Sequence, residues 1–476
     1  MDSEETRKGE SVLAALATVL NRLVEPRQGV PKERQLFSNR DLKALIIPLV
    51  IEQVLAMTVG MADTVMVSHA GEAAISGVSL VDMVNGVFLY VFNALGAGGA
   101  IIVSQYIGSR DLDQGRKSAG QLMMISVLLS SLFLAAVAFG NRGLLNLLFG
   151  QVSPQGMDAA LTYLIITAFS YPFMAAYSAC TALFRAMGLS SVTMKISLAM
   201  NILNVAGNAI GVFVLRAGVV GVAVASLVSR AAAALLMFLL LLDKKRPIFL
   251  RIQDMLRWNG RLLRRILGVA IPGGIESGLF QVCRVAMTSI IATFGAAQIA
   301  ANGVALSIDN VNTIVNSAMG LALTTVVGQC VGAADYDQAA YYIKKMLRIA
   351  QLGSMIVNFT VLFSLPFVLN LYALSPEARR YVTILVTIHT IWTILLGTTS
   401  GPLPSAIRAA GDIRFTLMMS VCSLLIGRLF FSFVFALWLD FGIVGMWLAM
   451  GTHWSLNSFP ALWRFQNGKW KNRKLV

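Results

Sequence analysis

Two carboxylates, Glu52 and Asp63, lie inside the first long apolar segment of the chain, at about residues 43–68. On a helix, the eleven residues from one to the other turn through about 1,100°, within ~20° of three full turns, and rise ~16 Å. The two side chains therefore share one helical face at different depths. Charged groups at membrane depth are costly and are by default functional. The spacing predicts a row of polar side chains that faces a cavity, where Asp63 binds a proton or a small cation.

Three asparagines are spaced to assist that carboxylate. Asn201, Asn204 and Asn208 stand at i, i+3 and i+7 in the apolar segment 192–214, and so share one helical face. Their uncharged donors and acceptors suit a group that holds Asp63 or coordinates Na⁺ beside it. The alternative is hydrogen bonding that only joins neighbouring helices.

Glu276 resembles Glu52 in its setting, because it follows Pro272 by four residues as Glu52 follows Pro48. Both glutamates are candidates for attracting a cationic substrate or for taking part in a proton relay. Alternatively, each pairs with a buried base, and Arg284 is the base nearest to Glu276 along its segment.

Three further candidate residues lie in apolar segments. Asp82 and Asp309 occupy roughly corresponding segments and are candidates for lining a cavity, as substrate or relay residues. His389 is an imidazole that can relay protons near neutral pH or act as a satisfied core donor.

Composition places these residues in a membrane protein. Of the 476 residues, 57% are hydrophobic and 13% are charged, whereas soluble domains carry roughly 25% charge. The four cysteines all lie in apolar segments without paired spacing, which indicates small buried side chains and not a disulfide framework or a metal site.

Twelve apolar segments reach the length needed to span a membrane, and we therefore predict an all-α protein. They lie at about 43–68, 75–105, 118–140, 159–182, 192–214, 218–242, 266–293, 299–330, 346–372, 382–401, 415–438 and 442–463.

The placement of Lys and Arg predicts the orientation. The chain has 38 basic and 23 acidic residues; 31 of the basic ones fall at the two termini and the even-numbered loops, and four fall in the odd-numbered loops. Both termini are therefore expected in the cytoplasm. The excess of basic residues therefore indicates the orientation of the chain in the membrane and does not indicate nucleic-acid binding.

The chain contains an internal repeat. An offset of 224 aligns Pro48 and Glu52 with Pro272 and Glu276, and an offset of 223 aligns one loop arginine with another. The aligned motifs are Gln105-x-x-Gly108 with Gln329-x-x-Gly332, Arg185-Ala-x-Gly188 with Arg408-Ala-x-Gly411, and Gly218-x-x-Gly221 with Gly442-x-x-Gly445. Six spans per repeat give both halves one orientation, so we predict two six-helix repeats related by a pseudo-twofold axis along the membrane normal.

These features predict five parts of the chain. They are a cytoplasmic N-terminal extension (1–41), an N-lobe with spans 1–6 (42–242), a basic cytoplasmic linker (243–265), a C-lobe with spans 7–12 (266–465) and a basic cytoplasmic tail (466–476). The linker has apolar residues near one helical face and is expected to lie along the membrane surface.

The motifs resemble the multidrug and toxic compound extrusion (MATE) family over about residues 40–465. The resemblance rests on Pro48 with Asp63-Thr64, on Gln105-x-x-Gly108 and on Arg185-Ala-x-Gly188. It implies a V-shaped antiporter with twelve helices, which exports organic, often cationic or amphipathic, compounds against an inward flow of H⁺ or Na⁺. It also implies that Asp63 is the N-lobe cation site and that Asn204 and Asn208 match a fifth-span motif.

The chain departs from the family pattern at three positions. Some bacterial branches have Asp where Asn208 stands. Branches with a C-lobe Na⁺ site have Glu at the position of Phe280 and Asp at the position of Gly397. A C-lobe Na⁺ site of that kind is therefore not expected.

We therefore predict a secondary antiporter for an organic substrate, with Asp63, Asn204 and Asn208 as the coupling site. Intramembrane acids outnumber intramembrane bases five to three (Arg230, Arg284 and Arg428 being the bases), which favours a cationic substrate. The alternative is a flippase for lipid-linked precursors. No zinc-protease motif or Ser/His/Asp arrangement points to an enzyme.

The expected setting of this transporter is the plasma membrane, as a multi-pass monomer in contact with lipid, with a bacterial inner membrane as the specific expectation. No cofactor is expected apart from the coupling ion, and no firm metal site, although Na⁺ binding at Asp63 is open.

Overall fold

The computed structural model describes residues 24–26, 30–68, 72–149, 154–372, 374–471, 473 and 475–476; of residues 32, 59–65, 67–68 and 72–74 it describes the backbone only. The described residues are mostly helical and contain no strand. Most of the expected N-terminal extension (1–23 and 27–29) lies outside them.

The first half of the chain forms the helices that we call the N-lobe. After a short 3₁₀ turn (η1, Lys32–Arg34), they are α2 (Asn39–Ser68), α3 (Glu72–Gly108), α4 (Leu112–Phe149), α5 (Pro154–Ala168), α6 (Tyr171–Ala186), α7 (Ser190–Ala209), the π-helix η2 (Ile210–Val214) and α8 (Gly218–Leu241).

The second half forms the C-lobe, which follows the short linker helix α9 (Ile252–Leu256). Its elements are α10 (Gly260–Ile291), α11 (Ala296–Gly332), α12 (Tyr336–Leu369), α13 (Pro376–Ser400), α14 (Pro402–Ala409), α15 (Ile413–Cys422), the π-helix η3 (Ser423–Phe430), α16 (Phe431–Phe433), the π-helix η4 (Val434–Trp438) and α17 (Gly442–Gln466).

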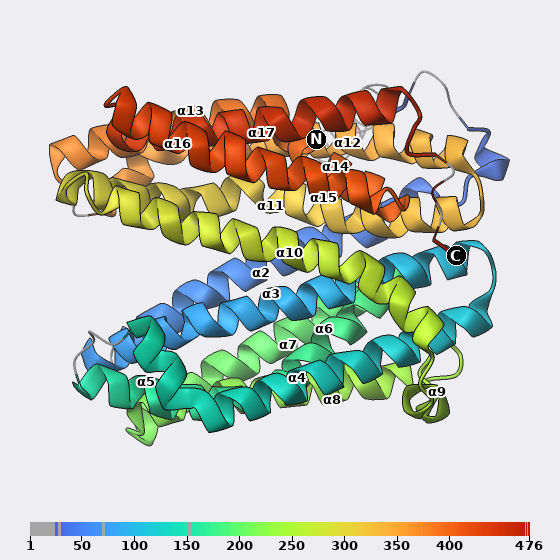
Figure 1. Cartoon of the computed structure of the whole chain (residues 1–476), viewed down its shortest axis with the longest axis horizontal. Helices are drawn as coiled ribbons and strands as arrows, with labels where there is room; N and C mark the ends of the chain where they lie inside the picture. Colours follow the sequence, from blue (N-terminus) through green and yellow to red (C-terminus); the bar gives the residue numbers. More distant parts are fainter. Residues whose placement is uncertain are drawn as a thin grey trace, which may run out of the picture.

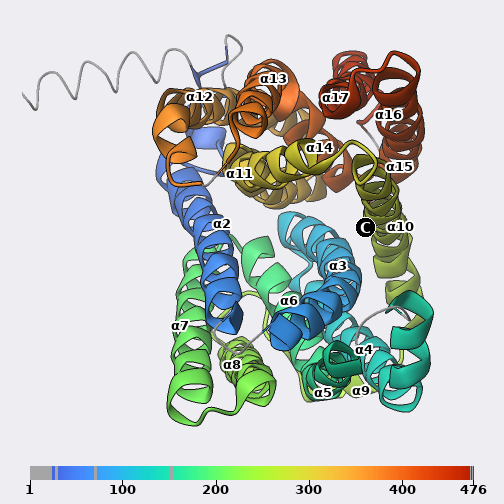
Figure 2. The same cartoon turned by 90° about the vertical axis from the view of Figure 1, so that its left-hand side faces the viewer.

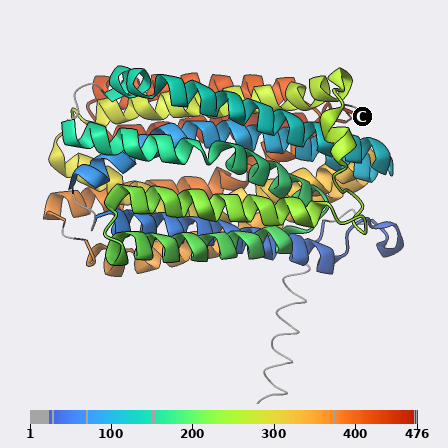
Figure 3. The same ribbon diagram turned by 90° about the horizontal axis from the view of Figure 1, so that it is seen from below.

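Among the described residues, nine helical segments are long and apolar enough to cross a membrane. A tenth span is the pair α5 and α6, which is bent by 50° at a break just before Pro172. Proline lacks the N–H that would continue a helix, so the break falls where the sequence requires it. Helices α2 and α17 run alongside these helices (Figures 1 and 3) and complete the twelve spans of the predicted fold.

The two lobes meet at one end and diverge towards the other (Figure 1). One cluster of buried apolar side chains runs through both lobes at the meeting end and includes Leu45, Ile102 and Leu323. Two other clusters each belong to one lobe, around Leu164 in the N-lobe and around Leu385 in the C-lobe. The core is therefore shared at only one end of the molecule.

The first helix of each half bridges the lobes, and Figure 2 shows α2 and α10 on opposite sides of the molecule. Helix α2 packs against α7 of its own lobe and against α11 of the other. Helix α10 packs against α15 and η3 of its own lobe and against α3 of the other. Each bridging helix carries the proline and the glutamate of the repeat.

Backbone conformations confirm the repeat at the level of single residues. Left-handed residues recur in both halves at the predicted offsets, as the pairs Arg110 and Ala334, Gly188 and Gly411, Arg216 and Asp440, and Gly218 and Gly442. The π-helices η2 and η4 are likewise separated by 224 residues. The two halves therefore share their breaks and turns as well as their spans.

Helices α3 and α11 cross at the meeting end through the two glycines of the Gln-x-x-Gly motifs. A Cβ on Gly108 would lie 2.0 Å from the carbonyl oxygen of Gln329, and a Cβ on Gly332 would lie 2.0 Å from that of Gln105. No side chain fits at either position, which explains the glycine in each motif.

The linker does not form one continuous surface helix. It contains the short α9, a break at residues 257–259 and then the start of α10. The side chain of Gln121 closes the break, because its Nε2 donates to the carbonyl oxygens of Asp254 and Arg257, and its Oε1 accepts from the amide of Asn259.

Candidate functional site

Glu52 on α2 forms an ion pair with Arg185 at the end of α6. The distance from Oε1 to Nη2 is 2.7 Å, and the hydroxyl of Thr193 donates to Oε2 at 3.0 Å. The glutamate side chain is 9% exposed and the arginine side chain is 20% exposed. Both carboxylate oxygens are thus engaged, and removal of either partner would leave the other charge largely shielded from water.

Glu276 on α10 forms the corresponding pair in the C-lobe. Its carboxylate contacts the guanidinium of Arg408 on α14 and accepts a hydrogen bond from the hydroxyl of Ser420 at 2.9 Å. Pairing with a base is therefore what the structure shows for both glutamates. The base suggested for Glu276 was wrong, because Arg408 reaches it from a neighbouring helix whereas Arg284 lies two turns further along α10.

The loops that carry these arginines also join the lobes. The Nε2 group of Gln329 in the C-lobe donates to the carbonyl of Ala186 at 2.8 Å, and Gln105 in the N-lobe donates to the carbonyl of Ala409 at 2.9 Å. In addition, the hydroxyl of Thr325 donates to the carbonyl of Arg185 at 2.9 Å. Each Gln-x-x-Gly motif therefore holds the Arg-Ala-x-Gly loop of the opposite lobe.

The three asparagines of α7 lie together on one buried face, as predicted. Asn204 Nδ2 lies 3.3 Å and 3.4 Å from the hydroxyls of Ser226 and Ser229 on α8, and Asn208 Nδ2 donates to Asn204 Oδ1 at 3.3 Å. Asp63 belongs to α2, which packs along α7, but its side chain is outside the described part of the chain. Its contact with these amides therefore stays a prediction.

Asp82 on α3 belongs to a second polar group of the N-lobe. The hydroxyl of Tyr163 lies 3.5 Å from its Oδ1. Arg230 on α8 interacts with the carboxylate electrostatically, but it is beyond ion-pair distance and donates instead to the hydroxyl of Ser170 at 3.0 Å. The groups around Asp82 therefore compensate its negative charge only in part.

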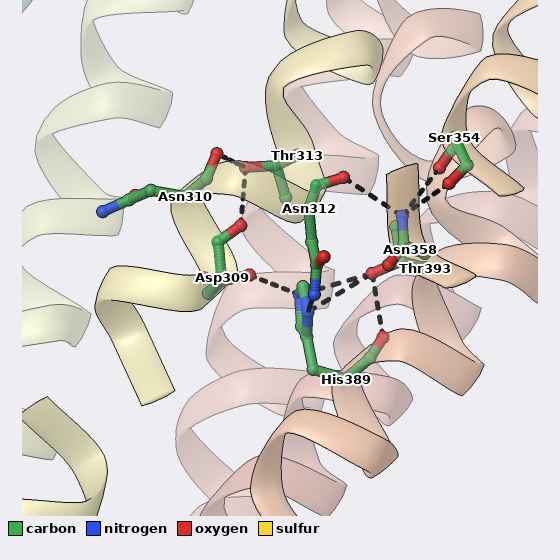
Figure 4. Close-up of polar contacts among 8 residues, drawn as sticks. All are labelled: Asp309, Asn310, Asn312, Thr313, Ser354, Asn358, His389 and Thr393. Atoms are coloured by element: carbon green, nitrogen blue, oxygen red, sulfur yellow. Dashed lines mark hydrogen bonds and ion pairs between the residues drawn. The ribbon is translucent and has the colours of Figure 1, made fainter. Parts of the chain in front are cut away.

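Asp309 on α11, which is partly exposed, pairs with the buried His389 on α13 in the C-lobe (Figure 4). Asp309 Oδ1 lies 2.5 Å from His389 Nε2, in an orientation outside hydrogen-bond geometry, so the contact is chiefly electrostatic. The imidazole is 1% exposed and the carboxylate is 21% exposed. The contact joins α11 to α13 within the C-lobe.

Amide and hydroxyl groups of α11 and α13 contact His389, and α12 supports them (Figure 4). Asn312 Nδ2 lies 3.3 Å from His389 Nδ1, and the hydroxyl of Thr393 donates to the His389 carbonyl at 2.8 Å. Asn358 on α12 donates to the carbonyls of Asn312 and Ser354. The network links α11, α12 and α13 within the C-lobe.

Cavities lie beside both glutamates and beside Asp309. One of about 700 Å³ is walled by N-lobe residues, among them Glu52, Arg185 and Arg230, and by Thr324 and Thr325 of the C-lobe. A second, of about 460 Å³, contains Arg408 and shares Ala97, Leu321 and Thr324 with the first. Glu276 lines a third, of about 180 Å³, and Asp309 a fourth, of about 340 Å³; both are formed mainly by the C-lobe, with Tyr90 of the N-lobe in the wall.

The charge balance differs from the sequence-based count. That count assigned Arg185 and Arg408 to loops, whereas the structure joins them to the glutamates of the bridging helices. Adding these two bases to the earlier three gives five acids and five bases. The balance therefore provides no preference for a cationic substrate.

No group of three or more His, Cys, Asp or Glu side chains converges on one point in the part of the chain that the structure describes. The Na⁺ site considered at Asp63 involves a side chain beyond that part, so it stays a prediction.

Sequence reasoning missed the partners of three acids. Arg185 and Arg408 occur in the repeated motif, at nearly the offset that relates Glu52 to Glu276, and that shared offset was the available signal. His389 was noted as a relay candidate, but nothing in the sequence joined it to Asp309, which lies on another helix.

The MatE family profile matches the chain twice, over residues 48–210 and 272–434. The two matches are 224 residues apart, the offset of the internal repeat. Together they cover more than half of the chain, including both bridging helices from their prolines onward.

Individual proteins resemble the chain over most of its length. A Bacillus subtilis (strain 168) protein named "Uncharacterized transporter YisQ" is 25% identical over 422 residues, which cover 86% of this chain and 90% of that protein. The "Probable multidrug resistance protein NorM" of Thermotoga maritima is 24% identical over 462 residues, which cover 95% of this chain and 96% of that protein.

Solved structures share the fold. One described as the "outward-facing conformation of a multidrug resistance MATE family transporter of the MOP superfamily" has a TM-score of 0.83 at 19% identity, and covers 94% of this chain and 98% of its own.

Proposed function

Because the chain belongs to the multidrug and toxic compound extrusion (MATE) family, we propose that it is a secondary active antiporter that exports amphipathic organic compounds in exchange for H⁺ or Na⁺. The family is one of multi-pass membrane transporters, and the chain is accordingly a membrane-embedded transporter of small molecules. We place it in the plasma membrane, as a monomer with both termini in the cytoplasm, in keeping with the distribution of Lys and Arg.

The observation that carries this proposal is the pair of mirrored glutamate–arginine contacts beside cavities walled by both lobes. Arg185 and Arg408 are tied through their loops to the glutamines of the opposite lobes. Movement of one lobe against the other therefore has to change the contacts that border the cavities. This coupling is what alternating access requires of a two-repeat transporter.

Two polar groups are proposed to couple the ion to that movement. In the N-lobe they are Asp63 with Asn204 and Asn208, where the asparagines already form a buried face against α8. In the C-lobe, the pair of Asp309 and His389 offers a second place for a proton. Loading either site changes the charge of a poorly solvated group, and so changes which lobe packing is favoured.

The test is dye export by the full-length protein in vesicles, with pH and Na⁺ gradients imposed separately. We expect one gradient to drive accumulation, and we expect Asp63→Asn to reduce that accumulation at least tenfold. Asp158→Asn, which changes an exposed carboxylate on α5, is the matched control. Full gradient-driven export by Asp63→Asn would refute the role of Asp63, and no response to either gradient would refute antiport.

A flippase for lipid-linked precursors is the second candidate. Such substrates carry phosphates, and the equal numbers of acids and bases no longer count against them. A lipid-scrambling assay on the same vesicles separates the two functions, because an antiporter moves dye without moving labelled lipid.

A further inference from the structure

The C-lobe cavity that contains Arg284 and Arg428 is, we propose, a binding site for the acidic group of an amphipathic substrate. The inference rests on the proposed transport function and adds the charge of the substrate to it. It concerns the cavity of about 340 Å³ between α10, α11, η3 and α17, which Tyr90 of the N-lobe also lines.

Neither arginine has a carboxylate within ion-pair distance among the residues that the structure describes. Arg428 donates from Nε to the sulfur of Met287 at 3.3 Å, a weak acceptor. Asp309 acts on Arg428 through space, but its carboxylate lies against His389. Two guanidinium groups thus face one carboxylate that is already engaged, and the cavity keeps an excess of positive charge.

The internal repeat shows that the N-lobe has no arginine at the position that corresponds to Arg428. The offset of 224 that superposes η2 on η4 aligns Asn204 with Arg428 and Asp63 with Met287. Where the N-lobe has a carboxylate and an amide, the C-lobe therefore has a thioether and a guanidinium. The proposed cation site of one lobe corresponds to a fixed cation in the other.

Local structure holds Arg428 at the cavity wall. The residue belongs to η3, a π-helical stretch, and such stretches are frequent at functional sites. The preceding Gly427 packs on α17 so closely that a Cβ would lie 2.6 Å from the Cα of His453. This contact limits sliding of η3 along α17, so the guanidinium is positioned by the backbone.

The remaining walls suit an apolar, planar body. They include the aromatic side chains Tyr90, Phe280, Trp447 and Trp454, together with Met287, Met446 and Met450. Aromatic rings and methionines accommodate varied flat ligands, and a guanidinium binds carboxylate, sulfonate or phosphate through paired hydrogen bonds. The other titratable groups at this cavity are Cys283, Asp309 and His453, with His389 behind Asp309.

Binding of two xanthene dyes of opposite charge tests the inference. Fluorescence polarisation of sulforhodamine B, which carries sulfonates, is compared with that of the cation rhodamine 6G on the purified full-length protein in detergent. We expect sulforhodamine B to bind more tightly than rhodamine 6G. We expect Arg428→Gln to weaken sulforhodamine B binding roughly ten- to hundredfold, as for loss of a charged hydrogen bond, and Arg428→Lys to weaken it less.

Two further variants separate binding from folding. Arg284→Gln changes an exposed side chain of the same cavity, so it should fold normally and still weaken sulforhodamine B binding. Arg142→Gln changes an exposed arginine outside the cavity and should leave binding unchanged. Tighter binding of rhodamine 6G by the wild type, or a change below twofold in both cavity variants, would overturn the proposal.

Competition identifies the source of the acidic group. Displacement of sulforhodamine B by short-chain phosphatidylglycerol, but not by phosphatidylcholine, indicates a lipid headgroup; displacement by free aromatic sulfonates alone indicates a soluble anion. Either result supports an acidic substrate. Failure of gradient-driven transport in vesicles would refute antiport independently, since these binding measurements need no gradient.

Discussion

Replacement of Gly332 by alanine is expected to keep the lobes apart at the end where α3 and α11 cross. The new Cβ would lie 2.0 Å from the carbonyl oxygen of Gln105, whereas a carbon and an oxygen in contact need about 3.3 Å. The two backbones must therefore separate by about 1.3 Å. Overpacking of this kind costs about 1–3 kcal/mol, and the upper value applies because the atom in the way belongs to the backbone.

We call a molecule closed when its lobes meet at this crossing and open when they are separated there. A penalty of about 3 kcal/mol lowers the ratio of closed to open molecules roughly hundredfold. The separation would also stretch the hydrogen bonds from Gln105 to Ala409 and from Gln329 to Ala186, which depend on the same crossing. Because the crossing is mirrored, Gly108→Ala should have the same effect as Gly332→Ala.

Distances between spin labels at positions 109 and 334 measure the closed fraction, after the exposed Cys422 has been replaced by serine. Gly303→Ala on α11 and Gly86→Ala on α3 are the matched controls, because a Cβ at either position meets nothing within 4 Å. An unchanged distance distribution in Gly332→Ala, or an equal shift in Gly303→Ala, would refute the reasoning.

Three further outcomes concern ion pairs. Glu52→Gln leaves Arg185 without its carboxylate and should lower the free energy of unfolding by about 3 kcal/mol. The double variant with Arg185→Gln should lose less stability, and thermal unfolding in detergent measures both variants. Asp412→Asn removes the partner of Arg464, 2.6 Å away, and because Asp412 is 4% exposed a similar loss is expected. Asp337→Asn breaks an exposed pair and should cost less than about 1 kcal/mol; an equal loss in the last two variants would contradict the dependence on burial.

Much of the fold is predictable because membrane spans and repeats leave local signals. Apolar length fixes where a helix crosses the bilayer, and the recurrence of Pro48 at Pro272 discloses the repeat. The recurrence extends to backbone conformation, since Arg216 and Asp440 are both left-handed. The π-helices are not predictable in the same way, because hydrogen bonds that span five residues instead of four leave no distinct pattern in a uniformly apolar segment.

The site is less predictable because its contacts join distant helices. Arg185 is 133 residues from Glu52 in sequence, and the two meet only because α6 ends beside α2. Asp309 and His389 lie on α11 and α13, and the rotation of both helices decides whether they meet. Hydropathy and charge counts place Glu52, Asp309 and His389 in the bilayer, but they do not say which group neutralises which acid.

The excess of guanidinium groups in the C-lobe cavity has an electrical consequence. Export of a cation against one entering H⁺ moves no net charge, whereas export of a monovalent anion against one H⁺ carries two positive charges inward. Each charge gains about 2.3 kcal/mol per 100 mV, so a cell with a negative interior would supply roughly 4.6 kcal/mol per 100 mV in every such cycle. A transporter with Arg284 and Arg428 at its substrate site would therefore generate current, and the membrane voltage could power it without any pH difference.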